Sequence, residues 1–379
     1  MGYGMRVLRA LAHPFGTFTH LSIGLLVLAS AQSLPAVPPQ QALATAPKFS
    51  SSEIFSSDRS YKIGQIDAYK EPIELLVFGG SRSQRFDAAY LTKATGLRAY
   101  NTGVHNGKPS DAWAFTSYCR AKNPDVTLYC LWSVHPSIRF QADFDPALVQ
   151  DPRLSTLFPQ EDMDEQEAKL RATLGIPRFI AWSPGTFGPD GTVTHNYYDF
   201  LESQGRTLDQ AVQEYVGMMN SSGKTSTPRT RSVSLQEVYF MRTLGLFNSM
   251  GVAPVLVYMP THPDAIAGIG TELWEGQNKR FREFLDRLKP YYDFVLLDYS
   301  HIASFGGDAN QFYDGVHIKA ENARRIVDSA LEDAPNAFKP NSVAPRSDGV
   351  DITREEALAI IQGPTITLED VARSALLPF

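Results

Sequence analysis

Three side chains in this sequence have the types and the chain order of a serine nucleophile with its base and its orienting acid. Ser81 follows the apolar run of "LLVFGGSRS", and Asp314 and His317 lie three residues apart in "DGVH". A serine hydroxyl is a poor nucleophile at neutral pH, because it needs an imidazole to accept its proton and a carboxylate to fix the tautomer of that imidazole. The sequence therefore predicts Ser81 as nucleophile, His317 as general base and Asp314 as the acid that orients it.

Each of these residues also has an ordinary structural interpretation. Ser81 could be the N-cap of a short helix, Asp314 a turn residue beside Gly315, and His317 a surface histidine. The joint placement of the three residues, with the Asp–His loop just ahead of the last predicted helix of the domain, favours the catalytic interpretation.

The elements that would position these residues alternate regularly along the chain. Short apolar runs predict strands at residues 73–79, 98–104, 125–134, 253–263 and 293–300. Longer amphipathic runs predict helices at residues 85–96, 110–123, 234–251, 276–292 and 319–334. We expect Gly96 to end the first of these helices and Ser110 to cap the second. Because strands that alternate with helices of this length are typical of βαβ units, we expect an α/β fold with a flavodoxin-like parallel sheet flanked by helices.

Ligands bind beyond the carboxyl ends of the strands in an open parallel sheet. The candidates for oxyanion or substrate binding that follow the predicted strands are Asn101, Gly103, Ser133, His135 and His262. The N–H groups of Ser81 and Gly103 could donate together to an oxyanion. His135 and His262 each adjoin a proline, which favours a place in a turn or a pocket wall, and Asn101 could serve only to hold the turn backbone.

The N-terminal residues have the composition of a targeting segment. A basic lead without acidic residues precedes the apolar residues 21–29 and the small residues of "ASA". We therefore expect a signal peptide at residues 1–31 that is cleaved before Gln32, and the alternative is an uncleaved N-terminal anchor. Residues 32–70 are rich in Pro, Ala and Ser and are expected to form a flexible linker. The protein is expected to be exported and to be periplasmic or extracellular, with the membrane anchor as a further option.

The predicted catalytic domain covers residues 71–335 and contains a long insertion at residues 136–233. The alternation of strands and helices stops in this insertion, where a charged helix and a "GPDG" turn between extended segments are expected. We expect the insertion to form a lid or a subdomain that shapes the substrate site. Residues 336–379 are expected to form a tail with two short helices, which begin with capping boxes at Thr353 and Thr367.

Composition narrows the classes of partner. The net charge of −6 and the pI near 5.8 exclude the basic footprint of a nucleic-acid-binding domain. The two cysteines, Cys119 and Cys130, could pair in an oxidising compartment or remain as separate buried thiols. The eight histidines have no metal-ligand spacing, so neither a metal nor an organic cofactor is expected.

These motifs resemble the blocks of the SGNH (GDSL-type) hydrolase family over residues 73–334, with the insertion unmatched. "FGGSRS" resembles the first block, which implies that Ser81 is the nucleophile. "YNTGV" resembles the second block, which implies that the Gly103 N–H belongs to the oxyanion hole. "DGVH" resembles the last block, which implies the orienting acid Asp314 and the base His317.

The sequence departs from the family pattern in two of these blocks. Gly80 stands where the family usually has aspartate. The family's third block, Gly-x-Asn-Asp, should follow the third strand, but "LWSVHPS" contains no asparagine. The third oxyanion donor is therefore absent, or it is replaced by Ser133, His135 or a residue of the insertion. Loss of one such donor can lower the rate by on the order of 10²–10³.

The departures are compatible with the exported branch of the family that resembles polysaccharide and teichoic-acid O-acylation proteins, which work beside a membrane acyltransferase. The resemblance implies an esterase or O-acyltransferase that acts on acetyl esters of an exported polysaccharide or cell-envelope polymer, through an acyl-enzyme on Ser81. Water or a sugar hydroxyl would resolve this acyl-enzyme, and the sequence leaves that choice open. The alternative is a non-catalytic glycan-binding or scaffold protein of an envelope polysaccharide assembly.

Overall fold

The computed structural model describes residues 58–136, 143–172, 186–223, 233–339, 343–346 and 349–362. The predicted leader, the predicted linker up to residue 57 and the predicted helix that begins at Thr367 lie outside the described residues. Within the described part of the chain, no helix combines the length and the apolar character that crossing a bilayer requires.

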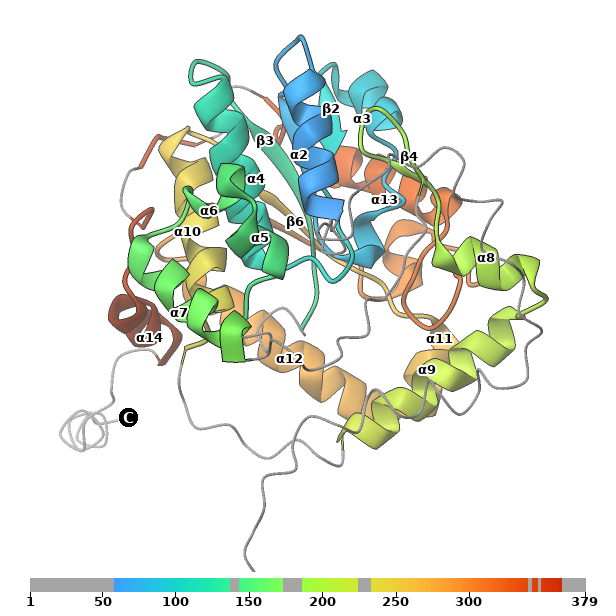
Figure 1. Ribbon diagram of the computed structural model, residues 1–379. Coiled ribbons are helices and arrows are strands. Elements are labelled where there is room, and N and C mark those ends of the chain that lie inside the picture. The colour runs from blue at the N-terminus through green and yellow to red at the C-terminus, as the bar shows by residue number, and fades with distance from the viewer. Residues whose placement is uncertain are drawn as a thin grey trace, which may run out of the picture. The chain divides into compact units, whose positions relative to one another are not determined.

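A parallel sheet of five strands organises the described residues (Figure 1). Its strands are β1 (Leu75–Phe78), β2 (Ala99–Asn101), β3 (Tyr129–Val134), β6 (Val255–Tyr258) and β7 (Val295–Asp298). They lie in the order β2-β1-β3-β6-β7, and all neighbouring pairs are parallel. All residues of β1, β2, β3 and β6 are buried, as expected for a parallel sheet that is covered on both faces. The predicted α/β class is confirmed, and the strand order is consistent with a flavodoxin-like fold.

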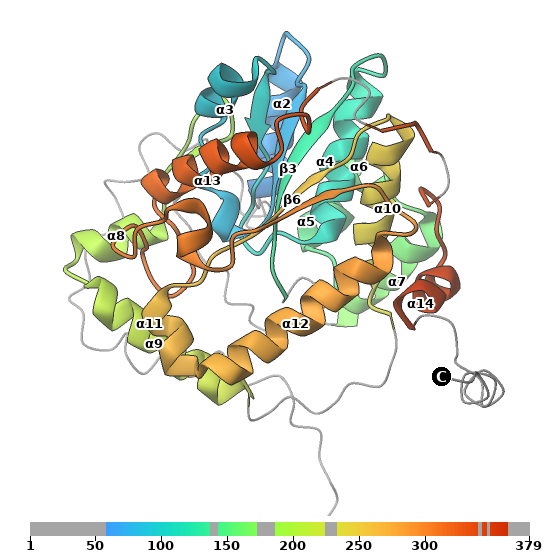
Figure 2. The ribbon, with the colours of Figure 1, turned by 180° about the vertical axis from the view of Figure 1, so that it is seen from behind.

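Helices cover both faces of this sheet. The helices that follow the strands are α3 (Ala88–Thr95), α4 (Pro109–Lys122), α10 (Leu235–Ser249), α12 (Thr271–Leu288) and α13 (Ala320–Asp333). α4 and α10 pack against each other on one face, and the ring of Phe240 in α10 lies 4.7 Å from that of Trp132 in β3. α3 and α13 lie together on the opposite face, which is nearer the viewer in Figure 2. There, Tyr90 of α3 donates a hydrogen bond to Asp328 of α13.

The helix ends test the predicted capping residues. Gly96 follows α3 with a φ of 77°, a left-handed conformation that favours glycine, so the predicted end of this helix is confirmed. The prediction that Ser110 caps α4 is wrong. The helix begins earlier, because Pro109 fits the first helical position, and the Asp111 carboxylate accepts from the N–H of Lys108 at 2.7 Å. Ser110 is buried inside the first turn.

The end of the predicted linker is folded, which corrects the boundary expected at residue 70. Residues 58–68 form helix α2 (Asp58–Ala68), whose side chains Arg59 and Lys62 are 2% and 0% exposed. The Arg59 guanidinium pairs with both carboxylate oxygens of Asp111, and Lys62 Nζ donates to the backbone oxygens of Asn101 and Gly191 at 2.6 and 2.8 Å. Burial lowers the pKa of Lys62 to about 7. Charged residues in a segment of this composition are normally expected to face solvent. Here the buried Arg59 and Lys62 instead attach the helix to the domain through their hydrogen bonds.

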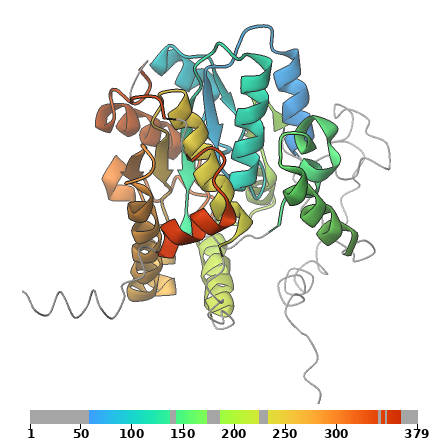
Figure 3. The same ribbon diagram turned by 90° about the vertical axis from the view of Figure 1, so that its left-hand side faces the viewer.

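The insertion divides into two parts that lie against different elements. The first part contains α5 (Pro146–Gln150), α6 (Pro152–Ser155) and α7 (Gln160–Ala172). These helices lie on the same side as α4, shown in green in Figure 3. The second part, residues 186–223, is called the lid segment below. It contains the hairpin β4 (Thr186–Phe187) and β5 (Val193–His195), followed by α8 (Tyr197–Ser203) and α9 (Leu208–Gly223).

The lid segment has its own small apolar core. Its helix α9 packs against α11 (Pro263–Ile269), which follows β6. The buried side chains of this core, to which α12 contributes Trp274, are Val212, Val216, Ala265, Ile266, Ile269 and Trp274. Because α11 begins just beyond the carboxyl end of β6, this contact places the lid segment at the edge of the sheet where the predicted site lies.

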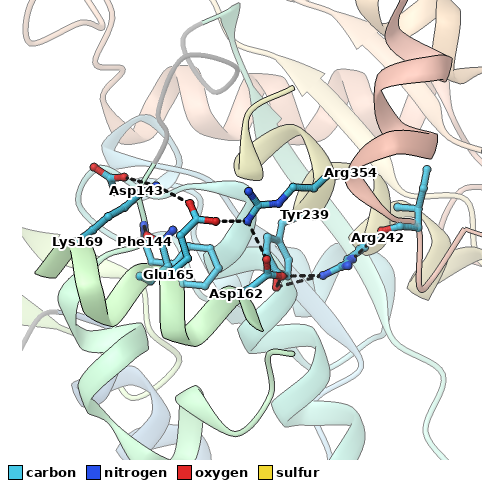
Figure 4. A network of polar contacts seen from close by, with 10 residues as sticks. Asp143, Phe144, Asp162, Glu165, Lys169, Tyr239, Arg242 and Arg354 are labelled. Atoms are coloured by element: carbon cyan, nitrogen blue, oxygen red, sulfur yellow. Dashed lines mark hydrogen bonds and ion pairs between the residues drawn. The ribbon is translucent and has the colours of Figure 1, made fainter. Parts of the chain in front are cut away.

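The first predicted tail helix docks on the domain. It is α14 (Arg354–Gln362), and the predicted capping box between Thr353 and Glu356 is present. Figure 4 shows the network that holds it: Asp162 of α7 accepts hydrogen bonds from Arg354, from Arg242 and from the Tyr239 hydroxyl. Asp162 is 3% exposed, so this carboxylate depends on these donors for its solvation.

The two cysteines are separate buried thiols. Cys119 lies on α4 and Cys130 on β3, and no disulfide joins them. Burial raises the pKa of both thiols, that of Cys119 to about 12. Both side chains are therefore protonated at neutral pH and act as small hydrophobic groups.

We expect Asp162→Ala to lower the free energy of unfolding by about 3–5 kcal/mol, because it leaves the buried Arg242 guanidinium and Tyr239 hydroxyl without their acceptor. The matched control on the same helix is Glu167→Ala, which removes an exposed pair with Arg171 and should change stability by less than about 0.5 kcal/mol. Urea unfolding curves of the two variants make the measurement, and equal losses would contradict the role given to Asp162.

Candidate active site

The chain turns sharply between β1 and Ser81. Gly79 has a φ of 141°, and a Cβ atom at this position would lie 2.0 Å from the Ser133 hydroxyl oxygen. A side chain is therefore excluded by both conformation and space. The short 3₁₀ turn Ser81–Ser83 follows, in which Ser83 donates its hydroxyl to the Gly80 oxygen at 2.8 Å. This turn lifts Ser81 to the carboxyl edge of the sheet.

Asn101, at the end of β2, holds this turn in place. Its side-chain amide donates to the backbone oxygens of Ser83 and Phe86 at 3.0 and 2.8 Å, and its side-chain oxygen accepts from the Gly103 N–H at 2.7 Å. Asn101 is fully buried. It is therefore a residue that positions the turn, which agrees with the structural interpretation considered for it.

Ser81, His317 and Asp314 form a continuous chain of hydrogen bonds. Ser81 Oγ lies 2.7 Å from His317 Nε2, and His317 Nδ1 lies 2.8 Å from Asp314 Oδ2. The other Asp314 oxygen accepts from the N–H groups of Val316 and His317 at 2.8 and 2.9 Å. Because Asp314 accepts from Nδ1–H, the neutral imidazole leaves Nε2 as the acceptor for the Ser81 proton. The three residues predicted to meet are thus adjacent.

The electrostatics of the Asp314 carboxylate suit this arrangement. Burial alone would raise its pKa, but the charge of His317 and the hydrogen bonds from His317 and Val316 lower the pKa to about 2. Asp314 is therefore ionised at neutral pH and can stabilise an imidazolium at His317.

The backbone donors differ in part from the expected oxyanion hole. The N–H of Ser81, and that of Arg82 next to it, form no hydrogen bond with any described residue. The Gly103 N–H is occupied by the Asn101 side chain. The structure therefore offers the turn at Ser81 and Arg82 as the local source of donors, rather than Ser81 together with Gly103.

The other candidates at the strand ends occupy different places. Ser133 is buried beneath Gly79, and its hydroxyl has no partner among the described residues. Burial, followed by the positive charges of Arg82 and His317, lowers the pKa of His135 well below its usual value.

His262 belongs to the wall that supports the Asp314–His317 loop. The ring nitrogen Nδ1 of His262 accepts a hydrogen bond from the Asp264 N–H and so caps α11. The backbone N–H of His262 donates to the Gly315 backbone oxygen at 2.9 Å. Its ring packs edge-on against Phe312 at 5.4 Å. It is buried, and it holds the loop in place through these contacts.

The lid segment brings a tyrosine to the same histidine. The Tyr198 hydroxyl lies 2.8 Å from His317 Nε2, and the two rings stack with centroids 4.1 Å apart. The hydroxyl is also within hydrogen-bonding reach of Ser81. Burial raises the pKa of Tyr198, followed by the negative charge of Asp314, so the phenol keeps its proton at neutral pH. Sequence reasoning missed Tyr198, although the Asn196–Asp199 capping box was a signal for a helix start there.

An ionic network holds Tyr198 in this position. Asp199, the next residue on α8, pairs with Arg85 and accepts from the Tyr313 hydroxyl at 2.5 Å. Arg85 also donates to the backbone oxygens of Val193 and Thr194 at 3.1 Å. Arg85 follows the turn that carries Ser81, and Tyr313 adjoins Asp314 in the loop that carries His317. Both the nucleophile turn and the loop of the base are therefore bound to the lid segment through Asp199.

Helix α9 adds a second tyrosine. A Cβ atom at Gly315 would lie 2.2 Å from the ring of Tyr215, so this ring packs directly on the Asp314–His317 loop. The Tyr215 hydroxyl lies within hydrogen-bonding reach of Arg82. The lid segment therefore contacts the loop of the base and the turn of the nucleophile at once.

No protein-family model matches the chain, and no curated protein matches it. Among the described residues, no group of three His, Cys, Asp or Glu side chains is arranged to hold a metal ion. The chemistry of the site is therefore argued from its geometry. A hydroxyl that donates to an imidazole, itself oriented by an ionised carboxylate, is suited to nucleophilic attack on an acyl carbon.

Asp314→Asn tests the charge of this carboxylate, because asparagine keeps an oxygen that can accept from the Val316 and His317 N–H groups. The pKa of Asp314 falls from 3.8 to about 2 on folding, so its ionised form stabilises the fold by about 2 kcal/mol near pH 6. This contribution is lost as the pH falls through 3.8 towards 2. We expect the urea stability of the variant to lie below that of the wild type near pH 6 and to approach it near pH 3. A difference that does not change with pH would contradict the assignment.

Proposed function

We propose that this protein is a serine-dependent esterase or O-acyltransferase of the SGNH type, which acts on acetyl or related acyl esters of an exported polysaccharide or cell-envelope polymer. The observation that carries the proposal is the unbroken chain from Ser81 through His317 to Asp314 at the carboxyl edge of the sheet. The resemblance of "FGGSRS" and "DGVH" to the blocks of that family supports the assignment.

The proposed reaction has two steps. Ser81 Oγ attacks the ester carbonyl carbon while its proton passes to His317 Nε2. The bond to the leaving alkoxide then breaks, and the imidazolium protonates the departing oxygen, which leaves an acyl group on Ser81. A second hydroxyl then attacks this acyl group and gives its proton to His317, and the imidazolium passes the proton to Ser81 Oγ as the bond between the acyl carbon and this oxygen breaks. Asp314 stays ionised throughout and stabilises the imidazolium.

The position of Tyr198 supports transfer over hydrolysis. In the second step, the attacking hydroxyl has to lie within hydrogen-bonding distance of His317 Nε2. The Tyr198 hydroxyl occupies such a position, 2.8 Å from this atom, and its ring covers the imidazole. Water is thereby kept from Nε2, and an acceptor with enough binding energy to displace Tyr198 takes its place. The proposed acceptor is a sugar hydroxyl.

The proposed setting follows from the N-terminal residues and the family resemblance. A signal peptide or anchor at residues 1–31 would export the protein to the periplasm or the cell exterior. A membrane acyltransferase is the proposed source of acyl groups there, and an envelope glycan is the proposed acceptor.

A non-catalytic glycan-binding or scaffold protein is the second candidate. Two observations favour it. The Gly103 N–H is occupied by the Asn101 side chain, and the stretch "LWSVHPS" at the end of the third strand contains no asparagine that could serve as an oxyanion donor. In a binding protein of this kind, the lid segment would keep its contacts with Ser81 and His317 at all times, and no ester would reach Ser81.

We expect a fluorophosphonate probe to add a single adduct to the wild-type protein, seen as one mass increase of the intact chain. Ser81→Ala removes the nucleophile and His317→Ala removes its base, so each should abolish the adduct or slow it by about 10³-fold or more. Ser304→Ala and His301→Ala, two exposed positions outside the site, are the matched controls and should label like the wild type. A folded wild-type protein without any adduct would favour the binding-protein candidate.

Tyr198→Phe should change how the acyl-enzyme is resolved, because it keeps the stacked ring and removes only the hydroxyl at Nε2. With 4-nitrophenyl acetate as donor and methyl glucoside as acceptor, we expect the ratio of acetylated glucoside to free acetate to fall by about fivefold, the equivalent of one hydrogen bond of ~1 kcal/mol. The exposed neighbour Tyr197→Phe is the control. An unchanged ratio in the Tyr198 variant would show that its hydroxyl does not exclude water.

A further inference from the structure

An arginine that forms no ion pair with any described carboxylate stands next to the proposed nucleophile. Arg82 follows Ser81 in the 3₁₀ turn, and its side chain is partly buried. No Asp or Glu among the described residues forms an ion pair with it. By contrast, the buried arginines Arg59, Arg85 and Arg242 each pair with an aspartate. A cation that is withdrawn from water without a counter-charge is costly, unless a ligand supplies that charge.

The side chain of Arg82 interacts with Tyr215 of helix α9. It lies within hydrogen-bonding reach of the Tyr215 hydroxyl, and the ring of Tyr215 packs on Gly315 in the loop of the base. Arg82 is therefore held between the nucleophile turn, the Asp314–His317 loop and helix α9. A group bound to this guanidinium would lie beside an ester that is positioned for attack by Ser81.

The charges around this position include the guanidinium of Arg82 and the ionised carboxylate of Asp314. The positive charge of Arg82 acts on His135, on the Tyr198 phenol and on the Tyr215 phenol, whose pKa values also reflect burial. The carboxylate in direct contact with His317 is Asp314, whose oxygens are already taken by that imidazole and by two N–H groups. Asp314 is thus engaged within its own loop, and among the described residues it forms no ion pair with Arg82.

We propose that Arg82 binds an anionic group of the polymer on which Ser81 acts, a sugar carboxylate or a phosphate, so that the substrate is an acidic glycan. This inference rests on the proposed function and adds the class of its substrate. The guanidinium fork matches the geometry of both anions and can bind either through two parallel hydrogen bonds. Because Arg82 adjoins the nucleophile, the anion would be carried by the acylated sugar or by its immediate neighbour.

The test uses three acetylated methyl glycosides that differ at one group: a glucoside, a glucuronoside with a carboxylate, and a glucoside 6-phosphate. We expect the wild type to prefer one of the two charged esters over the neutral ester in kcat/KM by about 10–100-fold, as a hydrogen-bonded charge pair provides. The preferred ester identifies the anion. Arg82→Gln should bring this ratio close to one, Arg82→Lys should keep part of it, and the exposed Arg324→Gln should leave it unchanged.

A second measurement does not depend on turnover. Calorimetry of the Ser81→Ala protein with the unacetylated glycosides should show tighter binding of the charged glycoside, and this advantage should disappear when Arg82→Gln is added. Equal binding of charged and neutral glycosides, or an equal loss for all three esters in Arg82→Gln, would overturn the inference and leave Arg82 as a support for Tyr215. If the probe finds no activated serine while the charged glycoside still binds through Arg82, the proposed catalysis fails and the anion site stands.

Discussion

The arrangement of this protein depends on one buried amide. Every polar group of Asn101 is hydrogen-bonded: its side chain holds the nucleophile turn and the Gly103 N–H, and its backbone N–H donates to Asp190 of the lid segment. Its backbone oxygen accepts from Lys62 of α2. A single residue at the end of β2 thus connects the sheet, the turn that carries Ser81, the lid hairpin and the first helix. Because an unsatisfied buried polar group is costly, none of these four elements can shift alone without a penalty at Asn101.

The two halves of the insertion have separate tasks. Asp162 of α7 joins the first part of the insertion to α10 and to the tail helix α14. This part therefore forms an outer layer of the domain and contributes no residue to the Ser81–His317–Asp314 site described above. The lid segment is fastened to the nucleophile turn by Arg85 and to the loop of the base by Tyr215. Its position therefore follows that of Ser81 and His317, and Tyr198 can meet both of them.

Local patterns in the sequence predicted the sheet, its flanking helices and the meeting of Ser81 with His317 and Asp314, because strand ends of a parallel sheet share one edge. Helix α8 was missed because it has only seven residues and none of them is fully buried, which leaves too short a pattern to detect. Helix α2 was taken as linker because its packing rests on the buried cations Arg59 and Lys62. The place of the Gly103 N–H was also missed, since it depends on the rotamer of Asn101 and not on spacing.

The lid segment is fastened at several points, which decides how it can move, and between its two ends helix α8 is held by the pair of Asp199 with Arg85. Lys62 fixes its hairpin through the Gly191 oxygen, and α9 is fixed by its apolar contact with α11. A segment that is fixed at both ends bends between its fixed points and does not rotate about a single hinge. For the proposed polymer substrate, the small displacement left to this segment would make the stiffness and branching of the chain decide which of its sugars can reach Ser81.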